Sequence, residues 1–174
     1  MHKLTILGIG NILQFDDGIG IYATAFLKKN YDFTPSIHVK EGGVAGMALL
    51  DTLEQTHSLI ILDSIQIDDA VGSIYVIPAY ELRGYGINSG GAHEVGVLEA
   101  LDMLELQGKK LPNATVIGII PQEIDLQIGL SNPLQEHFNA FIKTVLENIE
   151  KLGFKIERKS TQVSLREIIN SFQD

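Results

Sequence analysis

The segment Ser58-Leu59-Ile60-Ile61-Leu62-Asp63 decides the fold class, because four consecutive aliphatic residues leave neither face of a strand suited to water. A strand that is apolar on both faces is typical of a parallel sheet covered by helices on both sides. Other short apolar runs alternate with helical patterns along the chain, which favours the same arrangement. We therefore expect an α/β fold, a three-layer sandwich whose twisted sheet is mostly parallel and carries helices on both faces.

The other strands of the predicted sheet come before and after this central one. A first strand is expected over Leu4–Ile9, a second over Ser36–Glu41 and a last core strand over Asn113–Ile120. The β-rich segment Gly72–Ala79 contains a proline and follows the central strand too closely for a helical crossover. We therefore expect it to be an antiparallel edge strand.

Helices are predicted where apolar residues recur at helical spacing. One begins near Gly18, one covers roughly 45–56, and one begins near His93. A final long helix has Asn132 as its expected cap and Pro133 at its first position. The glycine-rich segment 84–91, which precedes His93, is expected to be a mobile loop.

The length of 174 residues suits one domain with a single sizeable core. We expect residues 1–153 to form a single α/β domain. Residues 154–174 are expected to be a C-terminal tail that is either docked on the body or flexible. An amphipathic pattern around Leu165, Ile168 and Ile169 is the only helical signal in that tail.

Composition excludes several classes of function. The chain has 13 Lys and Arg against 22 Asp and Glu, a net charge of −9, which argues against a nucleic-acid partner. It has no cysteine, so any metal must be held by oxygen and nitrogen. No apolar run approaches the roughly 18 residues of a membrane span, and no signal peptide is recognisable. We expect a cytoplasmic monomer that binds no membrane.

Polar residues follow the predicted strands at the edge where open α/β sheets bind ligands. Asp17 follows the first strand, Glu41 ends the second, Asp63 ends the third, and His93 begins a helix. Each alone has an ordinary explanation: a helix cap for Asp17, a turn cap for Asp63, and a helix-start or surface position for His93. Together, two carboxylates and an imidazole form an oxygen and nitrogen ligand set for a divalent transition metal, with open coordination positions.

Several familiar motifs are incomplete. Gly8-Ile9-Gly10 resembles half of a dinucleotide fingerprint, but Leu13 stands where the third glycine should fall. His93-Glu94 begins like a zinc-protease motif, but Val97 stands where the second histidine should be. These departures disfavour nucleotide binding and hydrolysis by a resident zinc of that type.

An ordered series of motifs resembles the nickel–iron hydrogenase maturation endopeptidases, from Leu4 to about Gly153. The matching segments are Gly8-Ile9-Gly10-Asn11-Ile12-Leu13, Asp16-Asp17-Gly18-Ile19-Gly20, Glu41-Gly42-Gly43-Val44-Ala45-Gly46-Met47, Leu59-Ile60-Ile61-Leu62-Asp63, His93-Glu94-Val95-Gly96, Gly118-Ile119-Ile120-Pro121-Gln122 and Gly129-Leu130-Ser131. The order and number of these segments make the resemblance specific.

The resemblance implies an activity and a set of site residues. Asp17, Asp63 and His93 match the family's metal-contacting trio. The family removes a short C-terminal extension from the hydrogenase large-subunit precursor after nickel insertion, so the nickel arrives with the substrate and is not a resident cofactor. Glu41 is the candidate general base or orienting group. It departs from the family pattern, which has an aspartate there and a threonine where this chain has Val44.

Two other functions remain open at this point. A signalling receiver domain phosphorylated on Asp63 would use Asp16 and Asp17 to hold magnesium, but its acidic pair should lie at the strand end and not nine residues beyond Leu7. It should also have a lysine after the last core strand, where this chain has Pro121-Gln122-Glu123. The second alternative is a hydrolase of small molecules with a resident metal.

Overall fold

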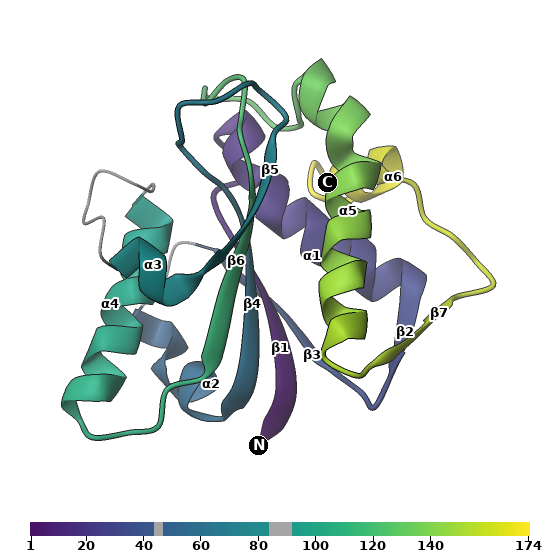
Figure 1. Cartoon of the computed structure of the whole chain (residues 1–174). Coiled ribbons are helices and arrows are strands. Elements are labelled where there is room, and N and C mark those ends of the chain that lie inside the picture. The colour runs from purple at the N-terminus through teal and green to yellow at the C-terminus, as the bar shows by residue number, and fades with distance from the viewer. Residues whose placement is uncertain (44–46, 84–91) are drawn as a thin grey trace.

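A twisted, five-stranded sheet forms the middle layer of the molecule (Figure 1). The computed structural model describes residues 1–43, 47–83 and 92–174. In spatial order the strands are β3 (His38–Gly43), β1 (His2–Ile9), β4 (Thr56–Ser64), β6 (Asn113–Ile119) and β5 (Ile74–Pro78). The first four run parallel and β5 runs antiparallel to β6. The predicted mixed sheet with one antiparallel edge strand is therefore confirmed.

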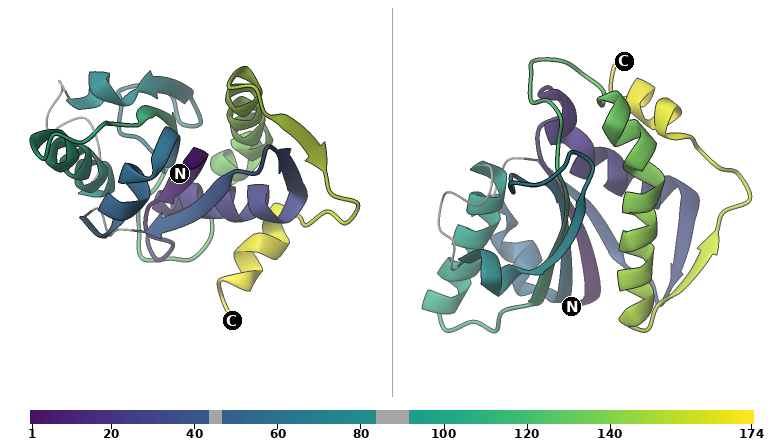
Figure 2. Two further views of the ribbon diagram at one scale, coloured as in Figure 1. Left: turned by 90° about the horizontal axis from the view of Figure 1, so that it is seen from below. Right: turned by 45° about the horizontal axis from the view of Figure 1, so that its top comes forward.

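Helices cover both faces of the sheet, as the two views of Figure 2 also show. One face packs against α1 (Ile19–Asn30) and α5 (Asn132–Lys151) around a core that includes Tyr22 and Phe138. The other face packs against α2 (Leu50–Glu54), α3 (Ala79–Arg83) and α4 (Ala92–Leu106). The layers are those expected from a central strand that is apolar on both sides. Within the described residues, no helix is long and apolar enough to cross a bilayer.

The first turn of α1 lies directly on the ends of β1 and β4. A Cβ added at Gly20 would lie 2.2 Å from the carbonyl oxygen of Leu62, a distance that no side chain tolerates. Glycine at this position therefore lets the helix approach the backbone of the sheet. The short 3₁₀ helix η1 (Phe15–Gly18), which precedes α1, is thereby held at the edge where the parallel strands end. We call this edge the carboxyl edge, and the opposite one the amino edge.

The last segment of the chain runs along α1. The strand β7 (Lys155–Arg158) pairs antiparallel with β2 (Tyr31–Thr34), and α6 (Leu165–Ser171) follows. Asn30 at the end of α1 accepts a hydrogen bond from the Val163 N–H at 2.6 Å and donates one to the Val163 carbonyl at 2.9 Å. The ring of Phe172 packs edge-on against Tyr22, with ring centres 5.6 Å apart.

Two predicted boundaries differ from the structure. The helix expected over 45–56 is shorter, since a 3₁₀ turn, η2 (Met47–Leu49), leads into α2 and β4 already begins at Thr56. The final helix begins at Asn132 and its cap residue is Ser131, which makes no side-chain capping hydrogen bond. The hydroxyl of Ser131 binds a buried carboxylate described below. The segment 84–91, expected to be a mobile loop, lies outside the described residues.

Candidate active site at the carboxyl edge

The candidate site lies where the chain connections leave β1 and β4 in opposite directions. From β1 the chain proceeds through α1 to β3 on one side, and from β4 it proceeds to β5 and β6 on the other. Such a switch point opens a crevice beyond the strand ends, which is where open α/β sheets bind ligands. Asp17 and Asp63 both lie at the strand ends beside this switch point.

Asp63 is the penultimate residue of β4 and is 1% exposed. Its Oδ1 accepts a hydrogen bond from the N–H of Ser64 at 2.8 Å. Gly10 lies beside it with a φ of 130°, and a Cβ at that position would lie 2.0 Å from the carbonyl oxygen of Asp17 and 3.7 Å from Asp63 Oδ1. Glycine at position 10 thus lets the turn after β1 pass close to the Asp63 carboxylate.

Asp17 lies in η1 and is 8% exposed. Its Oδ2 accepts a hydrogen bond from the N–H of Asn11 at 2.9 Å, and its Oδ1 accepts one from the hydroxyl of Ser64 at 3.2 Å. Ser64 therefore contacts both carboxylates, one through its amide and one through its hydroxyl. The cap of α1 is Gly18 and makes no side-chain hydrogen bond, so Asp17 does not act as the cap of that helix.

Asp16 is a buried residue of this edge that the sequence suggested only for the receiver-domain alternative and not for the metal-contacting trio. It is 0% exposed and accepts hydrogen bonds from the Ser131 N–H and hydroxyl, both at 2.7 Å. Its Oδ2 also accepts hydrogen bonds from the N–H groups of Gln122 at 2.9 Å and Glu123 at 3.1 Å. Asp16 thereby joins η1 to the loop between β6 and α5, and it fixes the backbone that carries Asp17.

A second contact joins the same loop to α1. The N–H of Gly129 donates a hydrogen bond to the hydroxyl of Tyr22 at 3.2 Å. Burial raises the pKa of Tyr22, while the hydrogen bond from Gly129 acts in the opposite direction. The phenol therefore stays neutral and keeps its role as an acceptor at physiological pH.

Glu41 reaches the same edge from the other side of β1. It is exposed, and it pairs with Gly8 in the parallel ladder. A Cβ added at Gly8 would lie 2.6 Å from Thr24 Oγ1 of α1, so Gly8 and its ladder partner Glu41 lie on the face of the sheet that α1 covers. Gly8 also pairs with Leu62, and the next residue, Asp63, therefore points to the opposite face. Glu41 and Asp63 share an edge but not a face.

His93 is the second residue of α4, and its side chain lies outside what the structure describes. The helix packs on the face that carries Ile61, two residues before Asp63, which is also the face toward which Asp63 turns. Among the described residues, no three His, Asp or Glu side chains are grouped as metal ligands. The described part of the candidate site is thus the carboxylate pair of Asp17 and Asp63.

Comparison with known sequences gives a consistent result. A family model described as hydrogenase maturation protease matches residues 21–148. The hydrogenase 2 maturation protease of Escherichia coli (strain K12) is 28% identical over 152 residues, which cover 87% of this chain and 93% of that protein. The hydrogenase expression/formation protein HoxM of Azotobacter vinelandii is 26% identical over 153 residues, covering 87% and 74% of the two chains.

Solved structures agree with the sequences. The hydrogenase maturating endopeptidase HybD of E. coli superposes with a TM-score of 0.84 at 27% identity, covering 91% of this chain and 98% of that one. The nickel–iron hydrogenase maturation protease HybD of Thermococcus kodakarensis gives a TM-score of 0.68 at 27% identity, covering 86% and 98%. With most of its length matched by the family model, the chain belongs to the hydrogenase maturation protease family, whose members are endopeptidases.

Proposed function

We propose that this cytoplasmic protein removes the C-terminal extension of a nickel–iron hydrogenase large-subunit precursor after nickel has been inserted. The observation that carries the proposal is the convergence of Asp17 and Asp63 on Ser64 at the switch point of a maturation-protease fold. The chain belongs to a family of peptide hydrolases, which excludes the alternative of a receiver domain.

Nickel is part of the substrate in this proposal. Asp17, Asp63 and His93 capture the ion while it is still bound to the precursor, and carboxylate and imidazole groups suit a divalent transition metal. The chain contains no cysteine, so the thiolates that hold nickel come from the precursor. Two carboxylates buried at one crevice also favour a cation over an anion there.

Capture of the ion holds the scissile peptide beside Asp17 and Asp63. The peptide and the catalytic groups are then already positioned for reaction, which lowers the entropic cost of cleavage. A nickel ion in this position either polarises the scissile carbonyl or lowers the pKa of the attacking water. Glu41 acts from the α1 side of β1 as the general base or as the group that orients this water.

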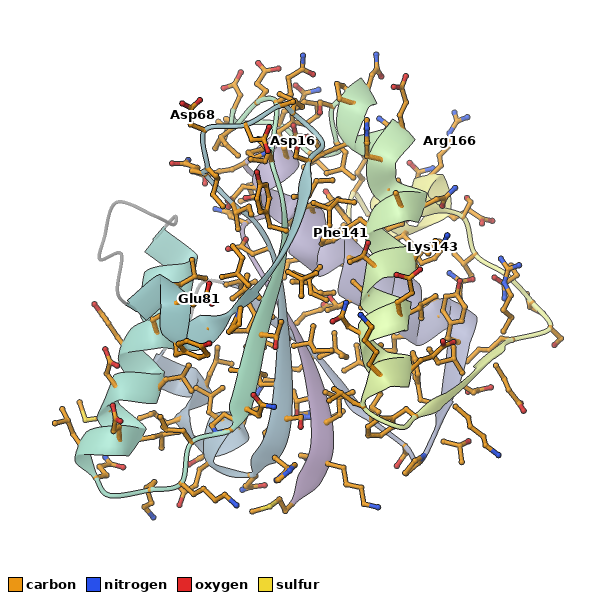
Figure 3. The ribbon with its side chains drawn as sticks, in the orientation of Figure 1. Asp16, Asp68, Glu81, Phe141, Lys143 and Arg166 are labelled. Carbon is orange, nitrogen blue, oxygen red and sulfur yellow. The ribbon has the colours of Figure 1, made fainter. Side chains whose placement is uncertain are left out.

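Substitution of the trio tests the proposal. Asp17→Asn, Asp63→Asn and His93→Ala should each slow cleavage of the nickel-loaded precursor about 100-fold or more, because the ion and the scissile peptide lose their position. Glu41→Gln should lower the rate without weakening capture. The matched control is Asp68→Asn, which changes an exposed carboxylate of the neighbouring β4–β5 loop (Figure 3). Wild-type cleavage by Asp63→Asn would contradict the proposal.

Metal analysis separates this function from that of a hydrolase with a resident metal. The purified chain should contain no stoichiometric zinc or manganese, since the three proposed ligands take their ion from the substrate. Tight binding of one equivalent of either metal, with turnover of a small ester or amide, would favour the hydrolase.

A further inference from the structure

Three large aliphatic side chains are exposed on neighbouring segments beside the candidate site. Leu13 is 52% exposed, Ile124 is 42% exposed and Leu126 is 84% exposed. We call these three residues the apolar rim. Exposed aliphatic side chains scattered singly are common, but several gathered on adjoining segments mark a contact surface.

Backbone hydrogen bonds hold the two segments of the apolar rim side by side. The N–H of Gln127 donates to the carbonyl of Leu13 at 3.0 Å, and the N–H of Phe15 donates to the carbonyl of Gln127 at 2.8 Å. The N–H of Asp16 donates to the carbonyl of Glu123 at 3.3 Å. The segment that carries Leu13 therefore lies against the segment that carries Ile124 and Leu126.

The apolar rim is also fixed in place before any partner binds. The buried Asp16 carboxylate accepts hydrogen bonds from Gln122 and Glu123 at the start of this loop and from Ser131 at its end. The Tyr22 hydroxyl holds Gly129 between them. A surface that is ordered in the free protein loses little conformational entropy when a partner docks, so its contacts contribute more fully to affinity.

The position of the rim indicates what covers it. Leu13 lies two residues from Asn11, whose N–H binds the carboxylate of Asp17. A protein whose chain enters the crevice at Asp17 and Asp63 must rest on the surface next to it. A second copy of this chain seated on the rim would lie over that entrance, which argues for the substrate as the occupant.

Charge indicates the chemistry of the partner surface. Exposed Glu123 and Asp125 alternate with Ile124 and Leu126 along the loop, in a chain with a net charge of −9. The complementary surface therefore has an apolar centre flanked by lysine or arginine side chains. Such a pairing uses the apolar contact for affinity and the charges for orientation and rate of association.

We propose that the apolar rim docks the folded body of the hydrogenase large-subunit precursor, through an apolar patch of the precursor that is flanked by basic side chains. The inference rests on the proposed function and adds the surface that recognises the protein part of the substrate. The crevice at Asp17 and Asp63 recognises the ion, and the rim recognises the chain that carries it.

Steady-state cleavage of the nickel-loaded precursor tests the rim. The double variant Leu13→Gln/Leu126→Gln should raise the KM about tenfold, corresponding to the loss of about 1.4 kcal/mol of docking free energy, and should leave kcat unchanged. The matched control is Leu106→Gln. Leu106 is 83% exposed, but it ends α4 at the amino edge, just before the chain enters β6 (Figure 1). This control should leave both constants unchanged.

A second variant tests the charges. Glu123→Lys/Asp125→Lys should slow capture of the precursor, and the effect should shrink as salt is added because exposed charges are screened. Both side chains are exposed, and the N–H of Glu123 that donates to Asp16 belongs to the backbone, so that contact remains. Asp125 Oδ1 accepts a hydrogen bond from the Leu126 N–H at 2.7 Å, so Glu123→Lys alone is the variant that leaves the contacts of the rim unchanged.

Each outcome decides between the two proposals. If the wild type cleaves the precursor and the Leu13→Gln/Leu126→Gln variant has an unchanged KM, the docking surface is wrong and the proposed function stands. If the wild type neither captures nor cleaves the nickel-loaded precursor, both fail. If the double variant abolishes self-association of the isolated protein in sedimentation while KM is unchanged, the rim serves a second copy of this chain and the docking proposal is overturned.

Discussion

The carboxyl and amino edges of the sheet differ in the polar groups that they bury. At the carboxyl edge, three carboxylates, those of Asp16, Asp17 and Asp63, are buried. Toward the amino edge, one buried polar contact is neutral: Thr5 Oγ1 lies 2.8 Å from Thr56 Oγ1 at the start of β4. Two neutral hydroxyls satisfy each other at a small desolvation cost, whereas a buried carboxylate costs several kcal/mol in desolvation unless it is fully hydrogen-bonded. The carboxyl edge therefore depends on the hydrogen bonds that its carboxylates accept, above all on the four that Asp16 accepts.

The largest expected effect is the loss of the Asp16 carboxylate. Asp16→Ala leaves the Ser131 hydroxyl and three backbone N–H groups without their acceptor, so the free energy of unfolding should fall by about 4 kcal/mol. Urea unfolding followed by circular dichroism measures this. Asp16→Asn keeps one acceptor oxygen but places an amide against N–H donors, and about half of the loss should remain.

The control for Asp16 is Asp32→Ala. Asp32 is exposed and lies 3.9 Å from Lys159, so its removal should change the free energy of unfolding by about 0.5 kcal/mol or less. If Asp16→Ala and Asp32→Ala lower the free energy of unfolding equally, the buried hydrogen bonds of Asp16 stabilise the fold no more than an exposed ion pair does.

The amino edge should be less sensitive. Thr56 Oγ1 donates to the carbonyl of Thr52 at 2.7 Å, so the hydroxyl of Thr5 is the donor to Thr56. Thr5→Val removes this donor and should cost about 1 kcal/mol, the usual contribution of one neutral hydrogen bond. The same urea measurement applies. A loss as large as that of Asp16→Ala would break the contrast between the two edges.

The smallest effect concerns pH. Burial lowers the pKa of His38 below its ordinary value, and three nearby basic groups lower it further: His2, Lys40 and Lys28. The folded state thus disfavours the charged imidazole, so its contribution to stability is complete above a pH of about 6.5 and is lost as the pH falls through the folded pKa. His38→Gln should flatten the fall in unfolding free energy between neutral and mildly acidic pH. An identical pH profile in the variant would contradict this assignment.

Local patterns in the sequence predicted the layers but not the contacts across the site. The apolar run before Asp63 was sufficient to predict a central parallel strand, and the spacing before β5 predicted the antiparallel edge. The role of Asp16 was not predictable, because its partner Ser131 is 115 residues away in the sequence. That contact also uses the hydroxyl of Ser131, which is the cap residue of α5 but makes no side-chain capping hydrogen bond.

Two further features depend on register, which a single sequence does not provide. Glu41 and Asp63 were both expected at the carboxyl edge, but only the pairing of β3 and β4 with Gly8 reveals that they point to opposite faces. The short pair of β2 and β7 was not predicted, because each strand has only four residues. β2 alternates aromatic and polar side chains, while β7 is largely polar. Their pairing is determined by tertiary contacts and not by local pattern.

Cleavage of matched precursors, one loaded with nickel and one free of it, tests the central claim most directly. Mass spectrometry of the large subunit after incubation with the wild-type protein measures the loss of the C-terminal extension. We expect this mass loss for the nickel-loaded precursor alone, because Asp17, Asp63 and His93 recognise the ion that the substrate carries. Equal cleavage of both precursors would contradict this recognition.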